Sequence, residues 1–145
     1  MPSFSRRSKE RLDSCHPRLI KLFEEVVKHY DCSILEGYRT PERQQELVDQ
    51  GMSRTLDSRH NRKPSMAVDC IPYPFKSADW TNMKRFYHFQ GFVKGTCLQM
   101  QRDGRLDASF ELRSGLDWDG DNDLDDQASF IDGPHFEIRE RAERG

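Results

Sequence analysis

A short apolar segment in the middle of the chain reads Ala67-Val68-Asp69-Cys70-Ile71 and stops at Pro72-Tyr73-Pro74. A run of this length that ends in a proline break is typical of a buried strand. An unpaired carboxylate inside such a strand would cost several kcal/mol, so Asp69 must have a partner. A metal ion is a natural partner, and the alternatives are the basic residues of the preceding loop: Arg59, Arg62 and Lys63.

Helical patterns lie on both sides of this segment. Apolar residues recur at helical spacing over residues 17–30 and 80–101. Between them, Thr40 is a predicted N-cap with Pro41 in the first turn, and Gly51 stands where that helix should end.

Short strands are predicted over residues 32–38, 109–113 and 135–139, and a long loop over residues 51–66. Helices and short strands in this order are typical of the α+β class. We expect a small antiparallel sheet with helices packed on one side.

The composition limits the classes of protein to consider. A chain of 145 residues is long enough for one domain, so residues 1–145 are predicted to form a single domain. Aromatic residues make up 10% of the chain, which argues against disorder although 33% of residues are charged. The net charge of -2 comes without a concentrated basic face, so nucleic-acid binding is not expected. The four cysteines are far apart and are expected to be buried free thiols.

The chain carries no sign of a membrane segment. No apolar run approaches the roughly 20 residues that a membrane span needs. Residues 1–7 also lack the apolar core of a secretory signal. We therefore expect no signal peptide, no membrane insertion and synthesis in the cytoplasm. A monomer is expected.

Two of the five histidines stand out by their surroundings. His60 lies in the long loop, nine residues before Asp69, and His135 begins the last strand, three residues after Asp132. Two histidines and one carboxylate form a ligand set that leaves a fourth zinc position open, which is typical of catalytic sites. Taken singly, His60 could be an exposed loop histidine and His135 a core residue.

A catalytic metal site also needs a base and a donor for the developing oxyanion. Asp132 is the candidate base, because a turn residue just before a ligand can reach the open coordination position. Arg39 is the candidate oxyanion donor, although it could instead be a solvated ion-pair partner. Glu137 could accept a hydrogen bond from a ligand imidazole.

These motifs resemble a known family. Ser58-x-His60, Ala67-x-Asp69 and Asp132-x-x-His135 are similar to the metal motifs of the M15 metallopeptidases. That group contains D-alanyl-D-alanine carboxypeptidases and dipeptidases and the phage L-alanyl-D-glutamate endopeptidases. The phage and prophage branch resembles this chain over further segments, which together cover most of it: Glu36 to Thr40, Arg43-Gln44, Ala67 to Pro74, Asp117 to Asp121 and Pro134 to Glu137. The spacing from His60 to Asp69 is two residues longer than in the common pattern, which changes the path of the loop between these ligands.

The resemblance implies roles for individual residues. His60, Asp69 and His135 would bind zinc, Asp132 would be the catalytic base, and Arg39 would steady the oxyanion. Ser58 would place substrate or the ligand loop. Trp118 would line the substrate groove or pack against the zinc site, with core packing as the alternative. The implied fold is the small hedgehog and D-Ala-D-Ala peptidase fold.

The function implied is that of a bacteriophage endolysin. Such a zinc-dependent hydrolase would cleave the L-alanyl-D-glutamate amide of the bacterial peptidoglycan stem peptide with metal-activated water. It would be made in the host cytoplasm and reach the cell wall after membrane permeabilisation, causing host lysis. Arg59, Arg62 and Lys63 beside the site are expected to attract anionic stem peptides. The alternatives are a D,D- or L,D-carboxypeptidase, or a non-catalytic metal-binding virion component or wall-binding module.

An acidic stretch precedes the last strand. Its aspartates alternate with other residues at Asp117, Asp119, Asp121 and Asp123, as in a calcium-binding loop. Asn122, however, stands where an EF-hand loop has glycine. A calcium site and a solvated acidic loop both remain open.

Overall fold

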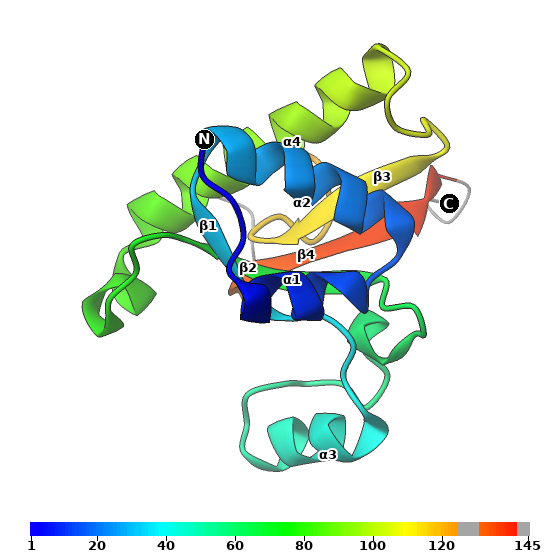
Figure 1. Cartoon of the computed structure of the whole chain (residues 1–145). Coiled ribbons are helices and arrows are strands. Elements are labelled where there is room, and N and C mark those ends of the chain that lie inside the picture. Colours follow the sequence, from blue (N-terminus) through cyan, green and yellow to red (C-terminus); the bar gives the residue numbers. More distant parts are fainter. Residues whose placement is uncertain (125–130, 142–145) are drawn as a thin grey trace.

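The computed structural model describes residues 1–124 and 131–141, so part of the acidic stretch lies outside it (Figure 1). The four strands of its sheet are β1 (Cys32–Glu36), β2 (Ala67–Pro72), β3 (Phe110–Gly115) and β4 (Asp132–Glu140). They pair antiparallel in the order β1-β2-β4-β3. The predicted antiparallel sheet is confirmed, and its central strand β2 is the apolar segment around Asp69.

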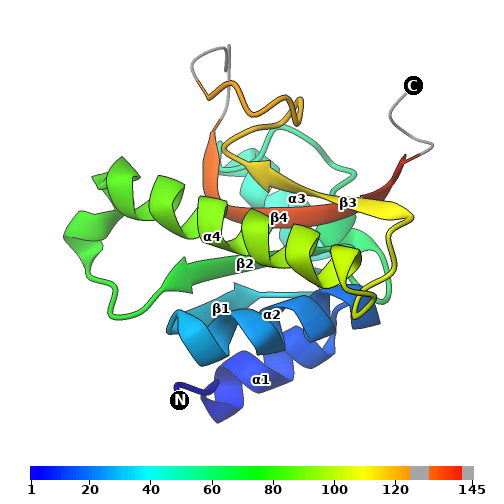
Figure 2. The ribbon, with the colours of Figure 1, turned by 90° about the horizontal axis from the view of Figure 1, so that it is seen from above.

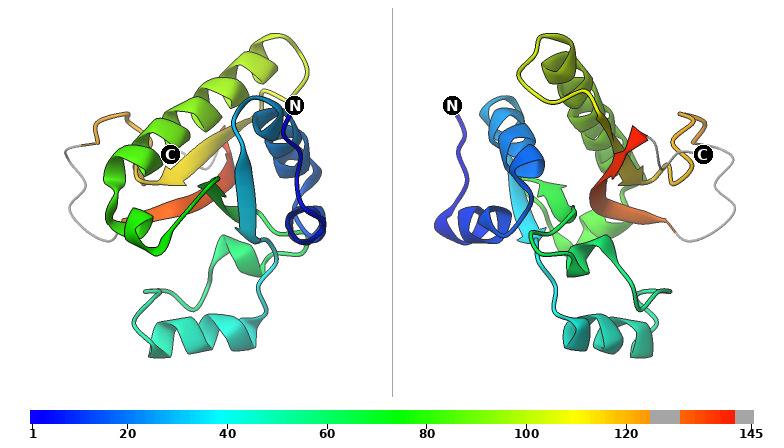
Figure 3. Two further views of the ribbon diagram at one scale, coloured as in Figure 1. Left: turned by 60° about the vertical axis from the view of Figure 1, so that its left-hand side comes forward. Right: turned by 90° about the vertical axis from the view of Figure 1, so that its right-hand side faces the viewer.

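The helices are α1 (Arg6–Asp13), α2 (Pro17–His29), α3 (Pro41–Asp49) and α4 (Met83–Arg102). Helices α2 and α4 cover one face of the sheet, and α1 lies beside β1 at the sheet edge (Figure 2). Helix α3 lies on the other side of the sheet, apart from it (Figures 1 and 3). The predicted arrangement, with helices packed on one side, therefore describes α2 and α4, whereas α1 lies at the sheet edge and α3 on the other side.

The side-chain alternation of the strands separates a core face from a polar face. On β4, Phe136 and Ile138 are fully buried in the core with α2 and α4. His135 and Glu137 alternate with them and point to the face that carries no packed helix. This alternation places the polar residues of β2 and β4 together on that second face.

Three features of the chain differ from the predicted elements. The helix α1 was not predicted, and the long loop contains a short 3-10 helix, Arg59–Asn61. The segment predicted as one helix from residue 80 is a 3-10 turn, Ser77–Thr81, followed by α4. The predicted apolar stripe of α4 is buried as expected, from Phe86 to Met100.

The four cysteines are all buried free thiols, as predicted. Within residues 1–124 and 131–141, none of the helices combines the length and the apolar character that crossing a membrane requires.

Candidate active site

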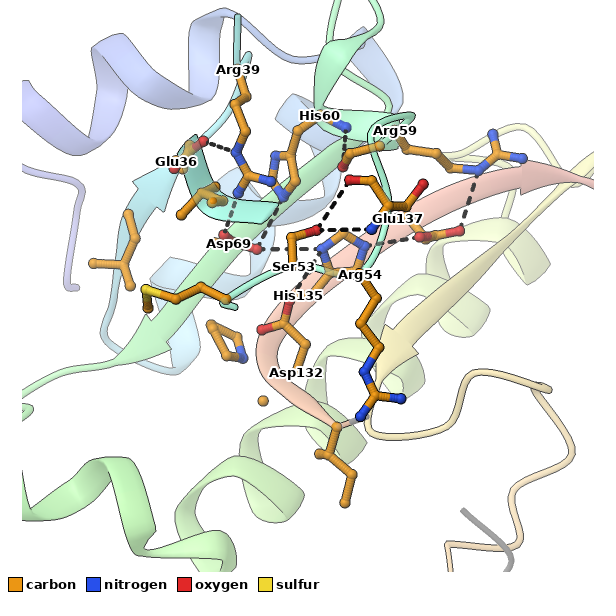
Figure 4. A pocket seen from close by; sticks show the side chains of 18 of the residues that line it. Glu36, Arg39, Ser53, Arg54, Arg59, His60, Asp69, Asp132, His135 and Glu137 are labelled. Carbon is orange, nitrogen blue, oxygen red and sulfur yellow. Dashed lines mark hydrogen bonds and ion pairs between the residues drawn. The ribbon is translucent and has the colours of Figure 1, made fainter. Parts of the chain in front are cut away.

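A pocket of about 920 Å³ opens on the polar face of the sheet. Strand β4 and Asp69 of β2 form its floor, and the two 3-10 segments, the start of α4 and the loop after α3 surround it (Figure 4). All seven residues predicted as metal ligands, catalytic groups or substrate contacts line it: Arg39, Ser58, His60, Asp69, Trp118, Asp132 and His135. The structure thus gathers these residues from five separate stretches of the chain.

The strand register brings two of the candidate ligands together. Asp69 on β2 lies opposite His135 on β4 and, on its other side, opposite Glu36 on β1. His60 reaches the same point from the 3-10 helix, and its Nε2 lies 3.1 Å from Asp69 Oδ1. His135 Nδ1 lies 3.4 Å from the same oxygen. Three potential ligand atoms from His60, Asp69 and His135 therefore lie within 4.8 Å of one another.

The second nitrogen of each imidazole is held by a partner of its own. His60 Nδ1 donates to the carbonyl oxygen of Gly37 at 2.8 Å, and His135 Nε2 donates to Glu137 Oε1 at 2.8 Å. These bonds turn His60 Nε2 and His135 Nδ1 toward Asp69, where a metal ion would take the place of the proton that His135 Nδ1 carries without it. Glu137 thus occupies the place of the predicted hydrogen-bond acceptor behind a ligand imidazole.

The donor set fits a divalent transition metal. Two neutral imidazole nitrogens and one carboxylate oxygen are the ligands found in catalytic zinc sites. His60 is 1% exposed and His135 is 5% exposed, so neither is an exposed loop histidine. Both rings are oriented by hydrogen bonds rather than packed as ordinary core residues, which is the usual second contact of a metal-binding histidine.

The charges around the site favour a cation. Burial alone would raise the pKa of the Asp69 carboxyl, but His60 and His135 hold it well below its usual range. Burial would lower the pKa of His135, yet its bonds to Asp69 and Glu137 raise it to about 10. Glu137 keeps a pKa of about 2 despite its burial, because His135 and Arg139 bind its carboxylate. Asp69 and Glu137 therefore remain ionised at neutral pH, so the group offers a charged carboxylate as a ligand to a metal ion.

Asp132 stands beside these residues without being part of the three-residue group. Its Oδ2 lies 4.0 Å from His135 Nδ1. Burial, followed by the charge of Asp69, raises its pKa to about 6. The position of Asp132 is set by Gly115 of β3, which pairs with it, and by the next residue, Gly133, which packs on the ring of Phe86. A carboxyl with this pKa can exchange protons near neutral pH.

Arg39 is not a solvated ion-pair partner. Its side chain is 10% exposed, and its guanidinium contacts Glu36, Gln44 and Asp69. The Nη2 to Asp69 Oδ2 distance is 3.5 Å. Asp69 therefore has His60, His135 and Arg39 as partners, and not Arg59, Arg62 or Lys63. Three of the five guanidinium N–H groups of Arg39 are used in these contacts, which leaves donors for a substrate oxygen.

Ser58 and Asn61 hold the loop that carries His60. The Ser58 hydroxyl accepts a hydrogen bond from the backbone N–H of His60, and the Asn61 side chain accepts from the backbone N–H of Ser58. Asn61 also donates to the carbonyl oxygen of Arg39 at 2.8 Å, and the Arg39 N–H donates to the His60 carbonyl oxygen at 2.8 Å. The loop with the longer ligand spacing is thus fastened to the segment that carries Arg39.

The structure adds contacts at the site that the sequence analysis did not predict, although Arg59 was expected beside it as a basic residue. Glu36 and Gln44 bind Arg39, while Arg59 and Arg139 bind Glu137. Glu36 and Gln44 lie in segments that carry the family resemblance, so the sequence contained a signal for these two residues. Arg59 and Arg139 are separated by most of the chain, so nothing in their spacing linked them.

Trp118 connects the pocket to the acidic stretch. Its ring lies 5.1 Å from the ring of His135, centroid to centroid, at an angle of 41°. Its carbonyl oxygen accepts a hydrogen bond from Arg113 of β3. The structure therefore places Trp118 against a candidate ligand and on the pocket wall.

The described aspartates of the acidic stretch flank Trp118 in sequence and do not line the pocket. Carboxylate oxygens of Asp117, Asp119 and Asp121 lie within 4.8 Å of one another, and Asp123 is not part of that group. Asp117 is fully buried, with one oxygen bound by Lys94 and by the backbone N–H of Asn122. Its other oxygen, Oδ1, has no hydrogen-bond partner among the described residues.

Comparisons with known proteins agree with this geometry. The family model described as phage L-alanyl-D-glutamate peptidase matches residues 2–139. Among solved structures, the chain is similar to the L-Ala D-Glu endopeptidase ChiX of Serratia marcescens, with a TM-score of 0.66 and 25% sequence identity. That alignment covers 99% of this chain and 96% of the other. The comparison with curated proteins gave no match.

Proposed function

The chain belongs to the phage L-alanyl-D-glutamate peptidase family, and from that premise we propose that it is a zinc-dependent endolysin. Its substrate would be the stem peptide of bacterial peptidoglycan, and the bond cleaved would be the amide between L-alanine and D-glutamate. The observation that carries the proposal is the convergence of His60, Asp69 and His135 in one pocket with Asp132 beside them.

In the proposed mechanism, His60 Nε2, Asp69 and His135 Nδ1 would hold the metal ion. A zinc ion there would lower the pKa of water to about 7 and polarise the scissile carbonyl group. The Asp132 carboxylate takes a proton from the attacking water and passes it to the amide nitrogen as the carbon–nitrogen bond breaks. Arg39 donates a hydrogen bond to the oxygen on which negative charge develops.

Asp132 also separates this proposal from a non-catalytic metal protein. A purely structural zinc site has all its positions filled by protein ligands and gains nothing from a nearby carboxyl base. Here the candidate ligand group has three members, His60, Asp69 and His135. The carboxyl of Asp132 lies 4.0 Å from His135 Nδ1, and its pKa is raised to about 6. This arrangement supports catalysis.

The test compares the wild-type protein, the metal-stripped protein and the variant Asp132→Ala on purified sacculi. We expect Asp132→Ala to retain zinc but lose hydrolysis by a factor on the order of 10² or more. The control is Asp49→Ala, which removes an exposed carboxyl on α3. Metal content and turbidity are measured on the same samples. Bound zinc without any clearing by the wild-type protein would refute the proposal.

The products distinguish the proposed bond from that of a carboxypeptidase. Cleavage between L-alanine and D-glutamate leaves a new N-terminal D-glutamate, whereas a D,D- or L,D-carboxypeptidase releases a free D-amino acid. End-group analysis of the digest separates them. The proposed enzyme would act on the wall after the membrane of the host has been permeabilised.

We propose in addition that the acidic loop binds calcium. Asp117, Asp119 and Asp121 offer oxygen ligands, which calcium prefers, and the buried Oδ1 of Asp117 lacks a partner among the described residues. The loop would then order Trp118 beside the pocket. Calcium should raise the Tm of the wild-type protein but not that of Asp119→Asn/Asp121→Asn, measured by differential scanning calorimetry. The same shift in both proteins would contradict the site.

A further inference from the structure

The strand β4 runs along the floor of the pocket and gives it two distinct ends. Asp132, His135, Glu137 and Arg139 line the pocket in this order along the strand. With a rise of about 3.3 Å per residue, the first and last are separated by roughly 20 Å. The candidate metal ligands lie between them.

The end near Asp132 is apolar. We call it the aromatic wall, and it consists of Trp80, Met83, Phe86 and Tyr87. It is tied to the start of β4, because a Cβ at Gly133 would lie 2.8 Å from the ring of Phe86. Trp80 packs on Phe86 with ring centroids 6.0 Å apart and is still 49% exposed. Exposed aromatic surface at the mouth of a pocket is typical of a binding site.

The opposite end is basic. We call it the arginine wall, and it consists of Arg59, Arg62 and Arg139. Arg59 Nε and Arg139 Nε lie 3.2 and 2.8 Å from the same oxygen of Glu137, whose other oxygen binds His135. One carboxylate thus faces two guanidinium groups. The hydrogen bond of Arg139 to Glu137 is made by its Nε.

The two walls lie at opposite ends of the sheet. The aromatic wall comes from the turn before α4 and from the start of α4, which lie on the left in Figure 1, and the green segment around residue 60 lies below the right half of β4. An extended peptide bound along β4 would therefore meet apolar side chains on one side of the metal ligands and guanidinium groups on the other.

The stem peptide has the same asymmetry about its first amide. On the N-terminal side lie L-alanine and the lactyl group of the muramic acid sugar, which carry no charge. On the C-terminal side lie the free α-carboxylate of D-glutamate and the carboxylates of the next residue. Sugars pack on aromatic rings, and guanidinium groups bind carboxylates with charge-assisted hydrogen bonds.

From this match we infer that substrate binds in one direction. The sugar and L-alanine lie against the aromatic wall, and the carboxylate-bearing side of the peptide lies toward the arginine wall. The inference rests on the proposed function and adds a subsite assignment to it. The walls, and not the metal ligands, would then discriminate this amide from the others in the stem peptide.

The test uses three substrates and measures kcat/KM for each. The first is the muramoyl tripeptide, the second has the D-glutamate carboxylate converted to an amide, and the third lacks the sugar. In Arg139→Gln, the ratio of kcat/KM for the free-carboxylate peptide to kcat/KM for the amidated peptide should fall about tenfold, as expected from the loss of a charged hydrogen bond. Glu137 keeps Arg59 as a partner in this variant, so the His135 contact is retained. Trp80→Ala should reduce only the preference for the sugar-bearing substrate.

Two control variants make the same chemical changes outside the pocket. Arg141→Gln removes a guanidinium two residues further along, where it binds the Ala108 carbonyl oxygen. Tyr73→Ala removes an aromatic side chain that is 58% exposed and does not line the pocket. Both preferences should be unchanged in these proteins.

Equilibrium binding of the three peptides to zinc-loaded Asp132→Ala separates this inference from the proposed function. A protein that cleaves nothing but binds with the expected preferences would refute the function and support the direction of binding. The inference would be overturned if Arg139→Gln lost the preference for the sugar and Trp80→Ala the preference for the free carboxylate. It would also be overturned if each variant lost both preferences equally. A wild-type protein that distinguishes none of the three peptides would overturn it as well.

Discussion

At the scale of single residues, Gln44 links Arg39 to the loop that borders the pocket. It is fully buried on α3, and its amide oxygen accepts a hydrogen bond from Arg39 Nη1 at 2.9 Å. Its amide nitrogen donates to Ser53 Oγ at 2.9 Å and to the Thr55 carbonyl oxygen at 2.6 Å. One side chain therefore fixes the Arg39 guanidinium and the loop that borders the pocket.

Replacement of Gln44 should affect both stability and activity. Gln44→Ala leaves buried polar partners unsatisfied, and we expect the free energy of unfolding to fall by about 1–3 kcal/mol. The kcat should also fall, because Arg39 loses a contact that orients it. Urea unfolding and hydrolysis of sacculi measure the two effects. Gln45→Ala is the control, since this neighbour is exposed and binds only Asp49. Equal effects of the two substitutions would contradict the role of Gln44.

The surroundings of Asp69 show how far residue type alone can lead. A carboxylate in an apolar strand must have a partner, and this requirement could be read from the sequence. Which partner it has depends on register, since Asp69 lies opposite Glu36 on one side and His135 on the other. The basic residues that are nearer in sequence bind elsewhere, with Arg59 on Glu137 and Arg62 on Asp57.

At the scale of elements, the turn after β1 is where the N-terminal helix meets the site. Gly37 is buried, and an added Cβ would overlap the Arg11 carbonyl oxygen and the Ser14 hydroxyl. Its own carbonyl oxygen accepts the hydrogen bond from His60 Nδ1. The close approach of two elements is thus used to orient a metal ligand.

This arrangement predicts opposite results for two glycine substitutions. Gly37→Ala should lower the free energy of unfolding by about 3 kcal/mol or more, because backbone must move to relieve the overlap. Gly91→Ala should raise it by about 0.5–1 kcal/mol, because Gly91 is exposed in α4 with free space around it. Thermal unfolding of both variants, with zinc titration of Gly37→Ala, checks this. If Gly37→Ala left the free energy of unfolding and the zinc affinity unchanged, the turn after β1 would be able to accommodate the added Cβ, and the prediction would be wrong.

The helix α1 explains why some elements were not predictable. It has eight residues, of which only Ser8 and Leu12 are buried, so it has almost no apolar stripe. It is held by β1 instead: the Ile34 N–H donates to Ser8 Oγ at 3.0 Å, and Arg11 Nη1 donates to the Ile34 carbonyl oxygen at 3.0 Å. These bonds cover the edge of the sheet. A short polar helix of this kind depends on tertiary contacts that local patterns do not contain.

At the scale of the whole molecule, the candidate metal ligands join separate parts of the chain. His60 comes from the loop after α3, Asp69 from the central strand and His135 from the last strand. A metal ion bound to all three would link these parts in the folded state only. Binding to the folded state alone raises stability in proportion to the logarithm of ligand concentration over Kd.

Metal removal should therefore lower thermal stability. We expect chelation of the zinc-loaded protein to reduce the Tm by about 10 °C or more, as binding far above Kd adds several kcal/mol. In His60→Ala the chelator should have little effect. His29→Ala is the control, because this exposed histidine binds Glu25 and lies far from the pocket, so its Tm should respond as in the wild type. A chelator response that is the same in His60→Ala would locate the stabilising metal elsewhere.

The amino-acid order was sufficient for the α+β class, for most helices and strands, and for seven of the residues that line the pocket. This was possible because periodicity, caps and proline breaks are local, and because the motifs of the family keep their residue types together. The register of β2 against β4, the hydrogen bonds that orient His60 and His135, and the two walls of the pocket could not be obtained in that way. They depend on contacts between residues far apart in the chain, such as Gly37 with His60 and Arg59 with Glu137. Such contacts form only when the helices have buried one face of the sheet and left the other open as the pocket floor.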